Sequence, residues 1–253
     1  MPYVTNAGVR LYYQTEGAGP ALFMLHGFTD SLDTWYELGY VEDLKRDYRL
    51  ILLDARAHGR SDKPHDSGAY SWALMASDVV AVMDAEAMPT AHFLGYSMGG
   101  RIGFALAQHS PERFPSLLLG GASPYTPDPS FVQPRVERLR QLGPQWGRPL
   151  SAALEARLRA NDIEALVAAL EGTNKHAGMD DVPPTMQMPC LLFVGEDDPN
   201  FAEAKACSAE MPNATLVTFP GLNHTDTFFA RELVIAEVRK FLRSVLDASL
   251  TRT

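Results

Sequence analysis

The chain has 253 residues, of which 46% are hydrophobic and 21% charged, a balance typical of a soluble globular protein. Its 22 Lys and Arg against 31 Asp and Glu give a formal net charge of −9, which argues against a nucleic-acid partner. Apolar runs are far shorter than the roughly 18 residues of a membrane span, and the first residues resemble no secretory signal. We therefore expect a cytoplasmic monomer or small homo-oligomer that binds neither a membrane nor nucleic acid.

Short apolar runs typical of strands alternate along the chain with longer stretches of helical periodicity. Many of these runs are apolar throughout, as in strands buried on both faces of a parallel sheet. Helical stripes between them would each cover one face of that sheet. This order predicts an α/β fold, a mostly parallel central sheet with helices on both faces. The strand candidates are 9–14, 21–25, 49–54, 91–95, 116–121, 190–195 and 214–219.

Residues 124–185 interrupt the alternation. The segment opens with a proline-rich stretch, closes with Pro183 and Pro184, and contains short helical patterns but no strand pattern. A helical insertion between two parallel strands usually lies above the sheet, and long connections are often functional. We predict a helical cap in 124–185, inserted in a catalytic core formed by 1–123 and 186–253. A peripheral helical subdomain without a role in binding is the alternative.

The strongest functional motif is Gly95-Tyr96-Ser97-Met98-Gly99, which follows an apolar run and precedes a helical stripe. This is a G-x-S-x-G sequence in a strand–turn–helix context, where the serine lies on a sharp turn and the glycines leave room for it. The N-terminus of the following helix stabilises negative charge beside the serine hydroxyl. The motif predicts that Ser97 is a nucleophile.

A serine nucleophile needs a base, and the base needs an orienting carboxylate. His224 lies in the loop after the last strand candidate, and Asp198 closes the loop after 190–195, so both are expected at the sheet edge that carries Ser97. The order Ser97, Asp198, His224 fits this architecture. Asp197 competes with Asp198 as the acid, and Asp128, in the loop that opens the predicted cap, is a third option.

Two backbone N–H groups and a set of aromatic side chains complete the predicted site. The segment Leu25–Phe28 follows a strand and can turn its N–H groups toward the serine, so Phe28 and Met98 are the predicted oxyanion donors. Further side chains that flank the motif loops could form apolar pocket walls, although each could equally belong to the core. These candidates are Phe28, Trp35, Tyr96, Tyr125 and Leu222.

Together the motifs resemble those of the α/β-hydrolase-fold serine hydrolases over nearly the whole chain. The family's oxyanion-loop motif corresponds to His26-Gly27-Phe28, and its nucleophile-elbow motif, the turn that carries the serine, corresponds to Gly95–Gly99. The loop that carries the family's acid corresponds to Gly195–Asp198, and the loop that carries its histidine corresponds to Gly221–His224. Residues 54–61 match a further family motif, D-x-R-G-x-G-x-S, except that Ala57 replaces a glycine. The resemblance implies acyl transfer to water through Ser97, His224 and Asp198, with no metal or organic cofactor.

We predict a carboxylesterase that cleaves small to medium esters. Serine at the elbow argues against the dehalogenases and epoxide hydrolases of this family, whereas carbon–carbon bond hydrolases, lactonases, perhydrolases and hydroxynitrile lyases keep serine and stay open. A small-molecule receptor with residual hydrolysis is the alternative from another class. Acidic residues in the predicted cap offset its basic residues, so we expect most of its arginines to form a solvated helix surface and the substrate to be uncharged. These arginines are Arg135, Arg138, Arg140, Arg148, Arg157 and Arg159.

Overall fold

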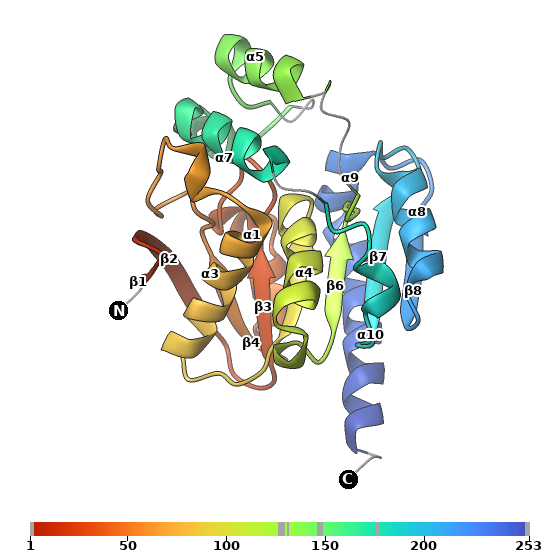
Figure 1. Ribbon diagram of the computed structural model, residues 1–253. Coiled ribbons are helices and arrows are strands. Elements are labelled where there is room, and N and C mark those ends of the chain that lie inside the picture. The colour runs from red at the N-terminus through yellow and green to blue at the C-terminus, as the bar shows by residue number, and fades with distance from the viewer. Residues whose placement is uncertain (1–2, 126–129, 131, 146–148, 176–177, 251–253) are drawn as a thin grey trace.

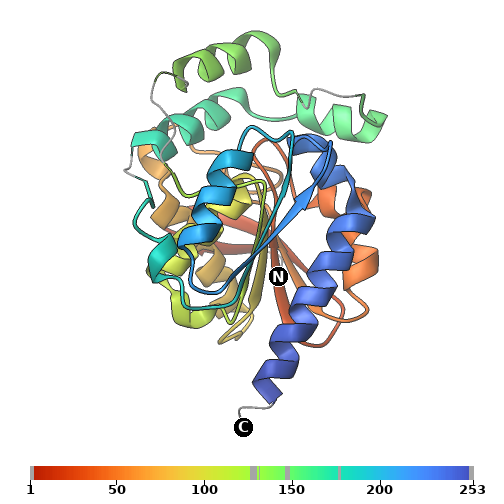
Figure 2. The same ribbon diagram turned by 90° about the vertical axis from the view of Figure 1, so that its right-hand side faces the viewer.

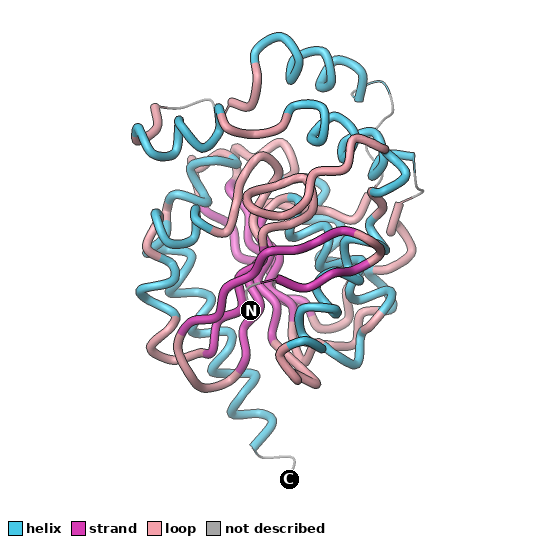
Figure 3. The backbone as a smooth tube through the Cα atoms, turned by 90° about the vertical axis from the view of Figure 1, so that its left-hand side faces the viewer, coloured by secondary structure: helices cyan, strands magenta, loops and turns pink. Residues whose placement is uncertain are grey.

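The computed structural model describes residues 3–125, 130, 132–145, 149–175 and 178–250, arranged as Figure 1 shows. Within these residues an eight-stranded sheet has the order β1-β2-β4-β3-β5-β6-β7-β8. Strands β3 to β8 are parallel, whereas β1 and β2 are antiparallel and form one edge, which faces the viewer in Figure 3. The strands are β1 (Tyr3–Asn6), β2 (Val9–Glu16), β3 (Ala21–Leu25), β4 (Arg49–Leu53), β5 (His92–Tyr96), β6 (Leu117–Gly120), β7 (Cys190–Gly195) and β8 (Ala214–Phe219).

The predicted α/β fold with a mostly parallel sheet is confirmed, and the uniform apolar runs reflect burial on both faces. In β3, Phe23 and Leu25 pack toward one helical layer, whereas Leu22 and Met24 pack toward the other. Helices α3, α4 and α8 form the first layer, and α1, α2 and α10 form the second (Figure 2). The core helices are α1 (Asp33–Glu37), α2 (Tyr40–Leu44), α3 (Trp72–Ala85), α4 (Met98–His109), α8 (Phe201–Glu210), α9 (His224–Phe229) and α10 (Arg231–Leu250), with 3-10 turns η1 (Ser67–Ala69) and η2 (Pro111–Arg113).

A group of helices lies above the carboxyl ends of the parallel strands, in the connection from β6 to β7 (Figures 1 and 2). It consists of α5 (Val132–Leu142), α6 (Ala152–Arg159) and α7 (Ile163–Lys175). The 3-10 turn η4 (Pro183–Thr185), later in the same connection, packs against α8 of the core instead. The described part of 124–185 contains no strand. Helix α7 packs against α5 and against η1 of the core, so these helices form a roof over the sheet edge where the candidate site lies. No helix in the described part of the chain is long and apolar enough to cross a membrane.

The loop after β4 fixes the backbone below this roof. Arg56 is almost fully buried and donates two hydrogen bonds of 2.6 Å to the carboxylate of Asp78 in α3. The carboxylate of Asp54 accepts hydrogen bonds from the backbone N–H groups of Leu32 (2.7 Å) and Arg60 (2.8 Å). Ala57 has a φ of 73°, in the left-handed region that glycine tolerates best, which explains why the resembled motif carries glycine there.

Candidate active site

Ser97 lies on a sharp turn between β5 and α4. Its φ of 55° and ψ of −111° are sparsely populated for a residue with a side chain. The neighbouring glycines make the turn possible, because a Cβ atom on Gly95 would lie 2.3 Å from the carbonyl oxygen of Gly99. A Cβ atom on Gly99 would lie 2.2 Å from the carbonyl oxygen of Leu25 in β3. Close backbone packing is therefore the physical reason for both glycines of the motif.

A chain of hydrogen bonds joins the three predicted catalytic side chains. His224 Nε2 lies 2.9 Å from Ser97 Oγ, and His224 Nδ1 lies 2.7 Å from Asp198 Oδ2. The Asp198 side chain is fully buried. Its competitor Asp197 is exposed and, within the described part of the chain, forms no hydrogen bond with His224. The third option, Asp128, lies outside the described residues. This arrangement allows His224 to accept a proton from Ser97 while Asp198 orients the imidazole ring.

The loops that carry the histidine and the aspartate are held by Tyr96 at the end of β5 and by Asn200 at the start of α8. Tyr96 donates a hydrogen bond of 2.5 Å to the backbone oxygen of His224, and its ring stacks on Phe228 with centroids 4.5 Å apart. Asn200 donates from its backbone to Asp198 Oδ1 (2.8 Å) and from its side chain to the backbone oxygen of Gly121 (3.1 Å). Asn200 was not among the predicted site residues, because an asparagine two residues after an acid carries no distinctive signal.

Gly121 also makes room for the catalytic histidine. Its φ is 56°, and a Cβ atom there would lie 3.0 Å from His224 Cε1. A side chain at this position would therefore be strained and would press on the imidazole ring. The glycine pair at the end of β6, Gly120 and Gly121, is a signal in the sequence that could have predicted a close approach at this point.

The loop after β3 lies beside Ser97, as expected for the oxyanion donors. A Cβ atom on Gly27 would be 3.4 Å from Ser97 Cβ, so the backbone passes close to the nucleophile. Met98 is the first residue of α4, and its N–H group has no acceptor within the helix. The backbone of Gly27, next to Phe28, and the N–H of Met98 thus both lie close to Ser97, so the oxyanion donors stay a prediction that this packing permits.

Two buried histidines hold this loop in place. His58 Nε2 accepts a hydrogen bond of 3.2 Å from the N–H of Thr29, and His26 Nε2 accepts one of 3.1 Å from the N–H of Ala55. Burial lowers the pKa of His26 to about 3 and that of His58 to about 4, so both rings are neutral at pH 7 and can accept these bonds. His26 and His58 therefore position the backbone near Ser97 and take no direct part in the reaction.

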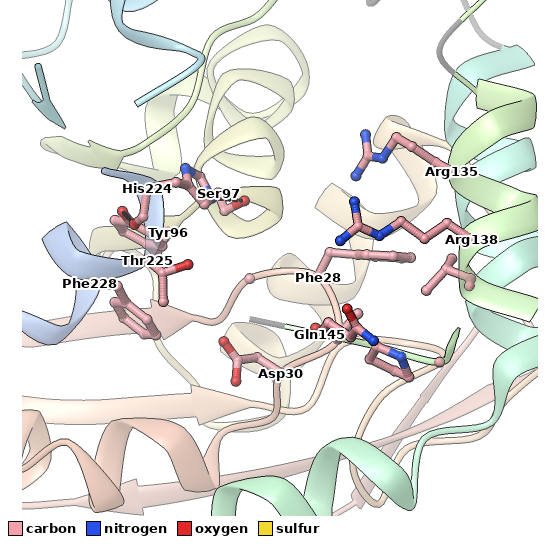
Figure 4. Close-up of a pocket in the computed structure, with 15 residues that line it drawn as sticks. Phe28, Asp30, Tyr96, Ser97, Arg135, Arg138, Gln145, His224, Thr225 and Phe228 are labelled. Atoms are coloured by element: carbon pink, nitrogen blue, oxygen red, sulfur yellow. Dashed lines mark hydrogen bonds between the residues drawn. The ribbon is translucent and has the colours of Figure 1, made fainter. Parts of the chain in front are cut away.

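Two cavities flank Ser97, with volumes of about 320 and 510 Å³. Both are lined by Phe28, Ser97, His224 and Arg135. Figure 4 shows the smaller one, where the labelled side chains of the core face α5 across the pocket. A cavity on each side of the nucleophile can hold the two halves of an ester whose carbonyl lies between them. Among the described residues, no group of His, Cys, Asp or Glu side chains is arranged to hold a metal ion.

Some of the side chains predicted to form pocket walls line a cavity, and others do not. Phe28 and Tyr96 line the smaller cavity, but Trp35, Tyr125 and Leu222 line neither. Trp35 is 1% exposed and packs edge-on against Phe228 in the core layer beside α10. Leu222 packs against the same layer, and Tyr125 packs against the opposite layer while its hydroxyl donates to Glu210 in α8. Predicting these three as pocket walls was wrong, because their side chains pack within or against the core layers and line neither cavity.

Most of the described arginines above the sheet are exposed, as expected, but two of them in α5 also line a cavity, which was not predicted. Arg140 and Arg159 pair with Glu164 and Glu155 on exposed surfaces, as expected for solvated helices. Arg135 and Arg138 line the smaller cavity, and Figure 4 shows both guanidinium groups projecting from α5 toward the catalytic side chains. Arg157 forms an ion pair with Glu37. Arg148 lies outside the described residues. The balance of charges along the segment does not reveal which helix face the cavity receives.

Comparison with known proteins agrees with this fold. The model of the α/β hydrolase fold family matches residues 20–188, so the chain belongs to this family of hydrolases. A Bacillus subtilis protein with the provisional name 2-succinyl-6-hydroxy-2,4-cyclohexadiene-1-carboxylate synthase is 28% identical, over 94% of this chain and 96% of its own. The 3-oxoadipate enol-lactonase 2 of Acinetobacter baylyi is 28% identical, over 78% of this chain and 79% of its own.

A solved structure gives the same result for the fold alone. The thermophilic esterase from Thermogutta terrifontis superposes with a TM-score of 0.82 at 24% identity, covering 96% of this chain and 97% of the esterase. The predicted membership of the α/β-hydrolase-fold hydrolases is therefore confirmed.

Proposed function

We propose that this protein is a serine hydrolase that cleaves small to medium carboxylic esters through an acyl-enzyme intermediate. The observation that carries the proposal is the hydrogen-bond chain from Ser97 through His224 to buried Asp198, placed between two cavities. The family supports hydrolysis in general, and the esterase and enol-lactonase among the similar proteins support an acyclic or cyclic ester as the substrate.

In the proposed mechanism, His224 accepts the proton of Ser97 while Ser97 Oγ attacks the ester carbonyl. The negative charge that develops on the carbonyl oxygen is held by the N–H groups of Phe28 and Met98. The intermediate collapses, His224 gives its proton to the leaving alcohol, and the acyl group stays on Ser97. A water molecule then attacks the acyl-enzyme with His224 as the base, which releases the acid. Asp198 stabilises the imidazolium ion in both halves.

Substitution of the nucleophile tests the proposal. We expect Ser97→Ala to lower kcat/KM for 4-nitrophenyl butyrate by about 10⁴- to 10⁶-fold, because the acyl-enzyme cannot form. Ser77→Ala is the matched control: Ser77 lies in α3, bonded to Asn6, and does not line either cavity. Equal hydrolysis by the Ser97→Ala variant and the unmodified protein would refute the assignment.

Two alternatives are distinguished by kinetics with the same protein. A cyclic ester such as a butyrolactone derivative, compared with a linear ester of equal chain length, tests lactonase activity, which the similarity to an enol-lactonase favours. Repeated turnover distinguishes an enzyme from a receptor. We expect the amount of 4-nitrophenol released to exceed the amount of protein many times over, whereas release of one equivalent followed by arrest would indicate a receptor.

A further inference from the structure

The smaller cavity beside Ser97 contains two cations from one helix face. Arg135 and Arg138 are three residues apart in α5, so they lie on the same side of the helix, about one turn apart. Both line the cavity, and Figure 4 shows their guanidinium groups directed toward the side that carries Ser97 and His224. Arg135 also lines the larger cavity, so it lies where the two cavities meet near the nucleophile.

No described acidic side chain neutralises these two charges. In the described part of the chain neither Arg135 nor Arg138 makes an ion pair, whereas Arg140 of the same helix pairs with Glu164 at 3.1 Å. Among the described residues that line this cavity, Asp30 is the only carboxylic acid. Burial raises its pKa to about 8, so it is mostly uncharged at pH 7. The described lining of the cavity therefore carries two positive charges and almost no negative charge.

Arg135 and Arg138 are exposed to solvent and also line the cavity, so each can stay charged without a protein partner and is free to pair with a bound ligand. Although Arg135 is exposed, the protein around its guanidinium removes part of its hydration and lowers its pKa. A guanidinium group presents donors in a rigid fork that matches a carboxylate. The rest of the lining offers apolar surface from Phe28, Leu139 and Phe228, which suits a short carbon chain.

We propose that the substrate is an ester or lactone that also carries a carboxylate, which Arg135 and Arg138 bind while the scissile carbonyl lies at Ser97. This inference rests on the proposed hydrolase function and specifies its substrate class. The overall net charge of −9 does not oppose it, because charges beyond about 8 Å are largely screened at physiological ionic strength. Contacts within the cavity therefore decide the preference, in contrast to the uncharged substrate expected from the composition.

Two matched pairs of esters test the proposal. On the alcohol side, 4-(butyryloxy)benzoate is compared with 4-acetylphenyl butyrate, which replaces the carboxylate with a neutral acetyl group. On the acyl side, mono-4-nitrophenyl adipate is compared with 4-nitrophenyl 6-methylheptanoate. Each kcat/KM is divided by the rate of hydroxide-catalysed hydrolysis of the same ester, which removes differences in intrinsic reactivity. We expect the unmodified protein to prefer the anionic member of at least one pair by about ten- to hundredfold.

Variants of α5 show whether the arginines cause this preference. Arg135→Met and Arg138→Met should each lower the ratio of anionic to neutral ester, mainly through a higher KM, and Arg135→Lys should retain part of it. Arg140→Met is the matched control, since it removes the same charge from the same helix outside the cavity, and its ratio should stay unchanged. Raising the salt concentration should weaken the preference in the unmodified protein.

The outcomes separate this inference from the hydrolase function. Hydrolysis of the neutral esters without any preference for the anionic ones would overturn the inference and leave the hydrolase proposal intact. The same conclusion follows if the ratio survives in both Arg135→Met and Arg138→Met, or if Arg140→Met lowers it equally. Failure to hydrolyse any of the four esters would instead contradict the hydrolase proposal. The preference of the unmodified protein is measured without any variant, so a variant that misfolds does not prevent the test.

Discussion

Asp30 is a buried carboxyl group in the candidate pocket, and its protonation affects both stability and pocket charge. It is 9% exposed, and its Oδ1 accepts a hydrogen bond of 2.6 Å from Thr34 Oγ1. Loss of hydration raises its pKa to about 8, Glu37 adds to the rise, and the bond from Thr34 and the charge of Arg157 offset it only in part. Asp30→Asn keeps the shape and can still accept the bond from Thr34, but removes the titration.

The effect on the free energy of unfolding follows from proton linkage. Below about pH 4, Asp30 is protonated in both the folded and the unfolded chain and adds no pH dependence. As the pH rises from about 4 to about 8, only the unfolded chain releases the proton, so the folded state is progressively destabilised. Above about pH 8 both states are ionised and the penalty stays constant. At 1.36 kcal/mol per pH unit, the interval from about pH 5 to about pH 8 corresponds to about 4 kcal/mol.

Urea unfolding of the unmodified protein and of Asp30→Asn at both pH values measures this term. The other carboxyl groups titrate alike in the two proteins and cancel in the difference. We expect the free energy of unfolding of Asp30→Asn, minus that of the unmodified protein, to increase by about 4 kcal/mol from pH 5 to pH 8. A difference that stays constant over this interval would mean that Asp30 is already ionised, and would refute the argument from burial.

Two further substitutions test the support of the site. Arg56→Met should lower the free energy of unfolding by about 3–5 kcal/mol, because it leaves Asp78 buried without its partner, and Arg56→Met/Asp78→Leu should regain most of that loss in urea unfolding. Equal losses in the single and double variants would argue against a buried ion pair. Gly99→Ala would place a Cβ atom 2.2 Å from the backbone oxygen of Leu25, and we expect ester hydrolysis to fall by about 100-fold in a protein that still folds by circular dichroism. Hydrolysis within twofold of the unmodified protein would contradict this packing.

The parallel strands could be predicted because burial on both faces leaves a direct mark on the sequence. Residues such as Leu22 and Phe23 enter opposite core layers, so the whole run is apolar. Strand β1 leaves no such mark, because its side chains alternate between exposed and half-buried positions at the sheet edge. The turn around Ser97 was recognisable for a similar reason, since close backbone contacts at Gly95 and Gly99 admit only glycine.

Pocket walls depend on packing between distant segments, and the sequence does not encode this locally. Trp35 follows the oxyanion loop closely in sequence, but the first turn of α1 directs it into the core against Phe228. Arg135 and Arg140 lie on the same helix with similar neighbours, but one faces the cavity and the other pairs with Glu164. The position of α5 above the sheet decides which of the two arginines faces the cavity and which faces Glu164.

The central claim is that Ser97 forms a covalent intermediate with the help of His224. Intact mass spectrometry after treatment with an alkyl fluorophosphonate, followed by peptide mapping, tests it most directly, because the reagent labels a serine activated by its neighbours. We predict a single adduct that maps to Ser97 and that is lost or greatly slowed in His224→Ala. An unlabelled protein, or an adduct that maps to another residue and persists in Ser97→Ala, would contradict the claim.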